Sequence, residues 1–409
     1  MSTKSRQIFY RALLTQLEDD LLFDVAEKLQ EATGLTKLDC PSNILVQNTR
    51  EALQDYDKQI VSDEFFDIDR FGSERPSFIN FDQTSREHLF AFNHHKSVSS
   101  TSFSSDGLFF ASGSHDASIR IFNVPKVASV IHKRKTDGDI VNNIKPLIHT
   151  VSCFNAPVTK LKFHPEAPFL AAAAENELRL LNCMHDGAHV RKVDWTFQSV
   201  KTNRRIRDFS FTSGGEYIAL ACDDPSYYLY SLETGDILTH SSDEVPNASL
   251  TAITTNSANS TIVTGSQDGV VAFWQNSQMV YGLQPHEGQG IAQLEQQGDY
   301  LITSGYDNNL CVFDVRNMTE PVSRFIIDRE GNTPCFTLAR NCLITPTILH
   351  KGNRKSVGLA VCDIYSSQIK TVESGHTDVI LSLDYNPSRG LLATGSNDTY
   401  CRIGPKMKK

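Results

Sequence analysis

The sequence of 409 residues lacks the signatures of membrane and secreted proteins. It has no run of 18 apolar residues and no basic N-terminal segment followed by an apolar one. Its nine cysteines are scattered and never form a C-x-x-C pair, which argues against a disulfide framework or a zinc site. These absences predict a soluble chain in a reducing compartment that neither spans a membrane nor enters the secretory path.

Motifs of catalytic chemistry are also absent. The sequence contains no G-x-x-x-x-G-K-[ST] phosphate loop, no H-E-x-x-H zinc motif and no G-x-S-x-G nucleophile elbow. No G-x-G-x-x-G occurs where a strand would lead into a helix. The histidines of His94-His95 and Gly375-His376 are the nearest features to a site. The sequence therefore predicts a protein that is not an enzyme and uses no cofactor or metal.

Acidic charge is concentrated at the front of the chain. Residues 1–87 hold 10 Lys and Arg against 17 Asp and Glu, a balance of −7, whereas the remainder has a balance of −2. A nearly neutral main body argues against broad electrostatic binding of nucleic acid. Two local basic clusters stand out; they consist of His132, Lys133, Arg134 and Lys135, and of Lys201, Arg204, Arg205 and Arg207. Solvated loop charge is the simplest interpretation, and partner docking, RNA contact and nuclear import remain open.

A four-residue phrase recurs along the main body. It reads GSHD at 113–116, GSQD at 265–268 and GSND at 395–398, with SGYD at 304–307 as a variant. Each copy follows a short apolar run and precedes a strand with alternating polarity, which is the pattern of WD repeats and their four-stranded blades. The small Gly-Ser pair lets backbones approach closely. We expect the aspartates to bind backbone N–H groups in turns between strands; these residues are Asp116, Asp268, Asp307 and Asp398.

Weaker copies of the phrase fill the gaps between the clear ones. Residues 170–182 carry Glu175 at the aspartate position, and residues 218–231 keep Asp224. The interval from Asp307 to Asp398 spans about two repeat periods, and residues 357–363 supply a strand for the hidden copy. The sequence predicts an all-β, seven-bladed WD40 β-propeller over residues 86–409. In such a blade His376 occupies the place of a histidine that forms a structural hydrogen bond.

The two ends of the repeat region predict how the ring closes. The last repeat stops soon after Ile403, before its fourth strand. Residues 86–93 form a strand-like run without a blade of its own, in which Leu89, Phe90 and Phe92 are apolar. We expect this run to pair with the last blade and close the ring, because unpaired edges would otherwise remain at both ends.

The front segment predicts a different kind of structure. Residues 1–60 contain a helical pattern from Arg6 to Ala32 and a shorter one from Ser42 to Tyr56, whereas residues 61–85 read as an acidic linker. Two such helices cannot bury a sufficient core alone, so they dock elsewhere or pair with a second copy. We favour an α-helical homodimerisation domain, formed through a stripe of Leu14, Leu17, Leu21, Val25 and Leu29.

The arrangement resembles one family, the WD-repeat (50-kilodalton) subunit of cleavage stimulation factor. The resemblance rests on SRQIFY at 5–10, GSHDASIRIF at 113–122, VTKLKFHP at 158–165 and residues 225–230. A long insertion at 125–150, expected between the first and second blades, adds to it. Departures from the family pattern are Glu175 in place of aspartate and Gly404 in place of tryptophan.

The resemblance implies a nuclear, non-catalytic subunit of the machinery for cleavage and polyadenylation of pre-mRNA. Its implied partners are a second copy of itself, the helical-repeat scaffold subunit of cleavage stimulation factor and the C-terminal domain of RNA polymerase II, with little or no direct RNA binding. A substrate adaptor of a ubiquitin ligase or a cytoskeletal regulator is the alternative, because a helical dimer joined to a propeller also occurs there. A propeller hydrolase lacks a candidate site in this sequence.

Overall fold

The computed structural model describes residues 90–404, except for 137–144, 153, 184, 187–188, 191–199, 242–247, 257–260, 287, 330–333, 340–341 and 352–353. The predicted dimerisation stripe from Leu14 to Leu29, the linker at 61–85 and Leu89 lie outside the described residues. Predictions on those segments therefore remain predictions.

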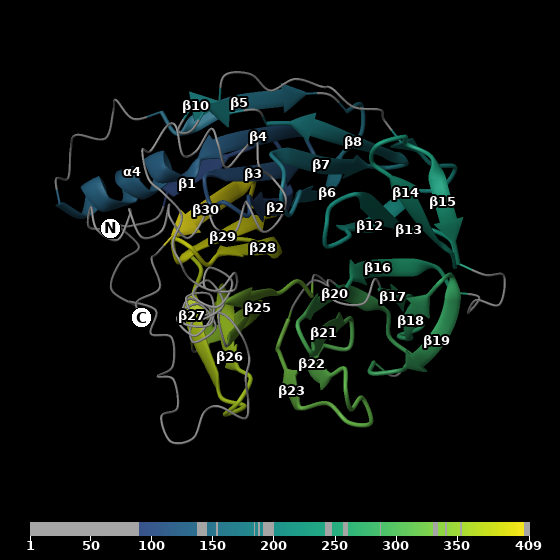
Figure 1. The fold of residues 1–409 in the computed structure, drawn as a ribbon. Helices are drawn as coiled ribbons and strands as arrows, with labels where there is room; N and C mark the ends of the chain where they lie inside the picture. The colour runs from purple at the N-terminus through teal and green to yellow at the C-terminus, as the bar shows by residue number, and fades with distance from the viewer. Residues whose placement is uncertain are drawn as a thin grey trace, which may run out of the picture. The chain divides into compact units, whose positions relative to one another are not determined.

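The described residues form seven antiparallel sheets of four strands, arranged as blades around a common axis (Figure 1). The prediction of seven blades is confirmed. From the axis outward, blade 1 consists of β2 (Val98–Phe103), β3 (Phe109–Ser114), β4 (Ser118–Asn123) and β5 (Leu147–Ser152). Blade 2 consists of β6 (Val158–Phe163), β7 (Phe169–Ala174), β8 (Glu177–Asn182) and β11 (Val200–Lys201). Blade 3 consists of β12 (Ile206–Phe211), β13 (Tyr217–Cys222), β14 (Tyr227–Ser231) and β15 (Ile237–His240).

Blades 4 to 7 continue the ring in chain order. Blade 4 consists of β16 (Leu250–Thr255), β17 (Ile262–Ser266), β18 (Val271–Gln275) and β19 (Gln278–Leu283), and blade 5 of β20 (Ile291–Gln297), β21 (Tyr300–Gly305), β22 (Asn309–Asp314) and β23 (Ser323–Ile326). Blade 6 consists of β24 (Thr337–Ala339), β25 (Cys342–Lys351), β26 (Arg354–Asp363) and β27 (Ile369–Glu373). Blade 7 consists of β28 (Ile380–Asn386), β29 (Leu391–Ser396), β30 (Tyr400–Gly404) and β1 (Phe90–Asn93). A two-stranded hairpin of β9 (His185–Asp186) and β10 (His189–Val190) lies between β8 and β11 in the chain.

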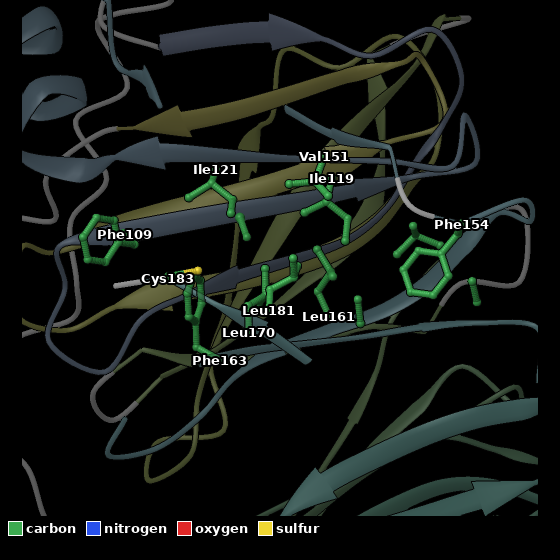
Figure 2. Packing of buried hydrophobic residues seen from close by; sticks show 14 residues of the cluster. Phe109, Ile119, Ile121, Val151, Phe154, Leu161, Phe163, Leu170, Leu181 and Cys183 are labelled. Carbon is green, nitrogen blue, oxygen red and sulfur yellow. The ribbon is translucent and has the colours of Figure 1, made fainter. Parts of the chain in front are cut away.

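The apolar core lies between neighbouring blades rather than in one central layer. Figure 2 shows the cluster between blades 1 and 2, which includes Phe109, Ile119, Ile121, Val151, Leu161, Phe163, Leu170 and Leu181. Successive side chains of a strand point to opposite faces of its sheet and therefore toward the blades on either side. Blade 1, for example, contributes to one cluster shared with blade 2 and to another shared with blade 7. Burying one aliphatic or aromatic side chain contributes about 1.5–3 kcal/mol, so the contacts between blades are the main source of stability.

The recurring glycines are required where one blade packs against the first strand of the next. A Cβ added to Gly113 would lie 2.7 Å from Val158, and one added to Gly395 would lie 2.7 Å from Val98. Both distances are shorter than an ordinary contact between carbon atoms. The second of these contacts joins the last blade to the first, because Gly395 belongs to blade 7 and Val98 to blade 1.

The ring closes through β1, which is the first described strand of the chain but the fourth strand of blade 7. It pairs antiparallel with β30, in a register that sets Phe90 opposite Ile403 and Asn93 opposite Tyr400. Phe92 packs its ring against Phe122 of blade 1, with ring centroids 4.0 Å apart. The strand is thus held by hydrogen bonds to one blade and by aromatic packing to the next.

The helix α4 (Val124–Thr136) follows β4 and lies beside β1 and β4 (Figure 1). It packs against the apolar cluster between blades 7 and 1, which includes Val98, Phe110, Phe122, Leu391 and Ile403. It begins after Asn123, whose side-chain oxygen accepts a hydrogen bond from the Lys126 N–H at 2.9 Å, as an N-cap does. Its apolar stripe has helical spacing and packs with Phe90 and Phe92; the residues of the stripe are Val124, Val127, Ala128 and Ile131.

The expected position of the insertion at 125–150 is wrong. The structure places it inside blade 1, between the third and fourth strands, because Leu147–Ser152 pairs with β4 and completes that blade. The chain leaves the blade after β4, forms α4 and returns as β5. The N-cap at Asn123 and the apolar stripe carried the signal for this helix, which the sequence analysis did not predict.

Candidate interaction surface

The strand order defines two opposite faces of the propeller. Within each blade the strands alternate in direction, so turns from the second to the third strand lie on the same face as connections from a fourth strand to the next blade. We call this the top face. The bottom face carries the turns from first to second strands and the connections from third to fourth strands. A propeller presents both faces to partners, and residues on different faces can contact different partners.

The four aspartates of the repeated phrase lie in top-face turns. Each accepts a hydrogen bond from the backbone N–H two residues ahead, as for Asp116 with Ser118 at 2.9 Å and Asp398 with Tyr400 at 2.9 Å. Asp307 binds the Asn309 N–H at 3.0 Å, and Asp268 binds that of Val270 at 3.4 Å. The residue after each aspartate has a positive φ, as Thr399 does at 71° and Gly269 at 87°. These carboxylates shape tight turns.

Three of the aspartates also pair with buried histidines that precede the first strand of their blades. The Nδ1 atoms of His94, His286 and His376 lie 3.2, 2.8 and 2.9 Å from Asp116, Asp307 and Asp398, respectively. An ionised carboxylate only accepts hydrogen bonds, so Nδ1 donates, and Nε2 accepts from a hydroxyl of the second strand. Those hydroxyls belong to Ser112 at 2.8 Å, Thr303 at 2.9 Å and Thr394 at 2.7 Å.

The sequence analysis missed His286, although its spacing was informative. It precedes Asp307 by 21 residues, whereas His94 and His376 precede their aspartates by 22. Burial lowers the pKa of His94 to about 4, although the neighbouring Asp116 carboxylate favours its protonated form. A neutral, buried ring held at both nitrogens serves to fix the turn rather than to transfer protons.

The two basic clusters lie on opposite faces. Lys201 ends β11, and Arg204 and Arg205 belong to the top-face connection that leads from it to blade 3; all three side chains are exposed. Arg207, also exposed, follows at the start of β12 and pairs with Asp223. His132 to Lys135 lie on α4 and therefore at the bottom face; their side chains are outside the described residues.

The sequence analysis did not identify a group of charged side chains on the innermost strands. Lys160 Nζ on β6 lies 3.0 Å from Asp208 Oδ1 on β12. Lys162 lies two residues beyond Lys160 on the same strand, and Glu295 and Asp384 occupy the position equivalent to Lys162 on the first strands of blades 5 and 7. Burial raises the pKa of Asp384 to about 7, although its carboxylate accepts hydrogen bonds from the N–H groups of Phe103 and Tyr385. The alternation of Lys160 and Lys162 with Leu161 is typical of a strand, but it does not indicate which charges would meet.

No group of three or more His, Cys, Asp or Glu side chains in the described part of the chain is arranged to hold a metal ion. No helix among the described residues is long and apolar enough to cross a membrane.

Seven four-stranded blades with Gly-Ser-x-Asp turns and His–Asp pairs define a WD-repeat β-propeller. The family model "WD domain, G-beta repeat" matches residues 86–123 and 366–403, and each match joins the fourth strand of one blade to three strands of the next. The chain thus carries WD repeats within a seven-bladed β-propeller.

Two curated proteins are similar to parts of the chain. "Cleavage stimulation factor subunit 50" of Arabidopsis thaliana is 30% identical over 187 residues, which cover 43% of this chain and 39% of that protein. A "LEC14B homolog" of Prunus armeniaca is 24% identical over 233 residues, which cover 53% of this chain and 46% of that protein. The matched segments thus span less than half of either relative.

Proposed function

We propose that this WD-repeat protein is a non-catalytic scaffold subunit of the nuclear machinery for pre-mRNA 3′-end cleavage and polyadenylation. The observation that carries the proposal is the 30% identity to "Cleavage stimulation factor subunit 50" over 187 residues. The propeller bridges other subunits, among them a helical-repeat scaffold subunit and the C-terminal domain of RNA polymerase II. The N-terminal helices join two copies into a homodimer.

The distribution of charge supports bridging through proteins rather than through RNA. A balance of −2 over residues 88–409 provides no general attraction for phosphate, and the exposed basic residues at 201–207 form a local patch on one face. A patch of this kind suits an acidic segment of a protein partner. We place partner docking at Arg204 and Arg205, with the Lys133–Lys135 segment of α4 as a second docking position on the opposite face.

The proposal is tested by affinity purification of the full chain from nuclear lysate of its source, with and without nuclease. We expect cleavage factors to be recovered in both conditions, and Arg204→Glu/Arg205→Glu to reduce their recovery. A control with the same charge change, Arg324→Glu/Lys370→Glu, alters exposed residues on the outermost strands of blades 5 and 6 and should retain them. Recovery of cullin-type ligase components instead would favour the adaptor, and recovery that nuclease abolishes would show attachment through RNA.

A further inference from the structure

Blade 6 carries an arginine where blades 1, 5 and 7 carry their buried histidine. Arg329 lies in the top-face connection between β23 and β24, and its Nη2 donates to Thr345 Oγ1 at 2.7 Å. Thr345 is on β25, the second strand of blade 6, as Ser112 and Thr394 are on the second strands of their blades. The separation in sequence is 16 residues for Arg329 and 18 for His94 and His376.

The aspartate that completes this arrangement elsewhere is missing from blade 6. Its second and third strands do not turn after the usual length; they continue as the long hairpin β25–β26, with His350 opposite Lys355. Arg329 Nη1 donates to Ser304 Oγ at 3.1 Å, whereas its buried Nε has no hydrogen-bond partner. Among the described residues no carboxylate lies within 4.0 Å of its guanidinium. Among the described residues the guanidinium thus forms no ion pair, and the Asp307 carboxylate, which already binds His286, favours its charged form only from a distance.

A cavity of about 470 Å³ lies beside this guanidinium, between blades 6 and 7. Its lining includes Arg329, Thr347, Lys355, Ser356, His376 and Asp378. Ser356 Oγ is buried and has no partner, so the lining offers a second unused hydrogen-bonding group. Asp378 is the carboxylate among the described lining residues, and it already accepts hydrogen bonds from Val379 N–H at 2.7 Å and from Asn397 Nδ2 at 2.6 Å.

We propose that this cavity binds the carboxylate side chain of an acidic peptide segment on a partner protein. A partly buried guanidinium that forms no ion pair among the described residues gains from an anion that reaches it through the cavity. Three other blades fill the equivalent place with an aspartate, so a carboxylate has the size and charge that the fold accommodates there. Lys355 lines the cavity as a second cation, and Ser356 can donate its hydroxyl hydrogen to the ligand.

The first test measures binding of two short peptides to the full chain by isothermal titration calorimetry. The probes are acetyl-Gly-Asp-Gly-amide and its neutral counterpart acetyl-Gly-Asn-Gly-amide. We expect the aspartate peptide to bind about tenfold more tightly or better, and Arg329→Gln to abolish the difference. The control Arg324→Gln, at an exposed position on β23, should retain it. Equal binding of both peptides overturns the proposal, as does a phosphoserine peptide that binds more than about tenfold better than the aspartate peptide.

The second test supplies the carboxylate from within the chain, and its main comparison keeps Arg329 in place. Ser356→Asp places an acid in the cavity wall, and we expect it to raise the melting temperature relative to Ser356→Asn and to abolish peptide binding. The double variant Arg329→Gln/Ser356→Asp should lose the increase. A Ser356→Asp chain that is no more stable than Ser356→Asn and still binds the aspartate peptide contradicts the assignment.

Discussion

At the scale of single residues, the repeated phrase acts through hydrogen bonds to its aspartate. In blade 7 the Asp398 carboxylate accepts hydrogen bonds from His376 Nδ1 at 2.9 Å and from the backbone N–H groups of Thr377 at 3.0 Å and Tyr400 at 2.9 Å. Three donors from two connections converge on one side chain. The carboxylate therefore ties the entry of the blade to its central turn.

The first prediction concerns the pH dependence of this contact. Burial acts to raise the pKa of Asp398, but the hydrogen bonds from His376 and the two N–H groups outweigh it and lower the pKa to about 2, from an ordinary 3.8. A carboxyl group with a lower pKa in the folded state stabilises the fold above about pH 4, and this contribution is lost as the pH falls toward 2. We expect Asp398→Asn to lower the free energy of unfolding by about 2 kcal/mol at pH 7, with the difference shrinking below pH 4.

Urea unfolding at several pH values between 7 and 3 checks this expectation. Asp236→Asn, at an exposed position before β15, is the matched control and should change stability little at any pH. A difference between the wild type and Asp398→Asn that stays constant from pH 7 to pH 3 would show that the carboxylate charge is not what stabilises the turn.

The sequence indicated some of these residues and hid others, for physical reasons. The turn aspartates were visible because short-range turns need particular residue types at fixed offsets. Arg329 was not visible, because nothing in its neighbours marks it as a substitute for histidine until the strands are paired. The charges of Lys160 and Asp208 meet only once two first strands lie side by side at the axis. Contacts between residues far apart in sequence require the fold.

At the scale of secondary-structure elements, closure of the ring depends on one short strand. β1 has four residues, so its hydrogen bonds to β30 alone provide a modest contribution. The aromatic contacts of Phe90 and Phe92, and the apolar stripe of α4, add a second source of stability. The strand run could be predicted from the missing fourth strand of the last repeat. The helix was hidden inside an insertion that resembled a loop.

The second prediction tests this packing. Phe92→Ala removes the ring that lies 4.0 Å from Phe122, and we expect a loss of about 2–4 kcal/mol, because a partly buried phenylalanine leaves a smaller cavity than a fully buried one. Ala91→Ser, on the exposed side of the same strand, is the control and should be nearly neutral. Thermal and denaturant unfolding measure both. A Phe92→Ala chain as stable as the control would mean that β1 does not hold the ring closed.

The third prediction removes the whole strand. A chain that starts at Val98 lacks β1, whereas one that starts at Ser85 retains it. We expect the shorter chain to aggregate or to melt well below the longer one, since the edge of β30 would be left unpaired. Equal melting temperatures for the two chains would contradict closure by β1.

At the scale of the whole molecule, the propeller separates two faces and the N-terminal helices are proposed to bring two copies together. Two linked propellers would present two sets of docking surfaces and gain avidity for a partner that is itself paired. Repeat spacing made the propeller predictable from sequence, because four of the seven blades repeat the same aspartate turn. The faces were not predictable without the strand order, which assigns the cluster at 201–207 and α4 to opposite ends of the axis.

The fourth prediction concerns self-association. Leu17→Asp/Leu21→Asp places two charges in the proposed dimerisation stripe, and we expect the full chain to become monomeric in light scattering while the propeller keeps its melting temperature. Lys4→Asp/Lys28→Asp, which adds acidic charge outside the stripe, should remain dimeric. A dimer that persists in the Leu17→Asp/Leu21→Asp chain would show that the helical stripe does not form the dimer interface.

The central claim, a role in mRNA 3′-end processing, is tested most directly by a cleavage assay in nuclear extract from which this protein has been depleted. We predict that depletion abolishes cleavage of a polyadenylation substrate and that addition of the purified full chain restores cleavage. If the depleted extract cleaves the substrate as well as the complete one, the protein has no part in the reaction and the proposed function is wrong.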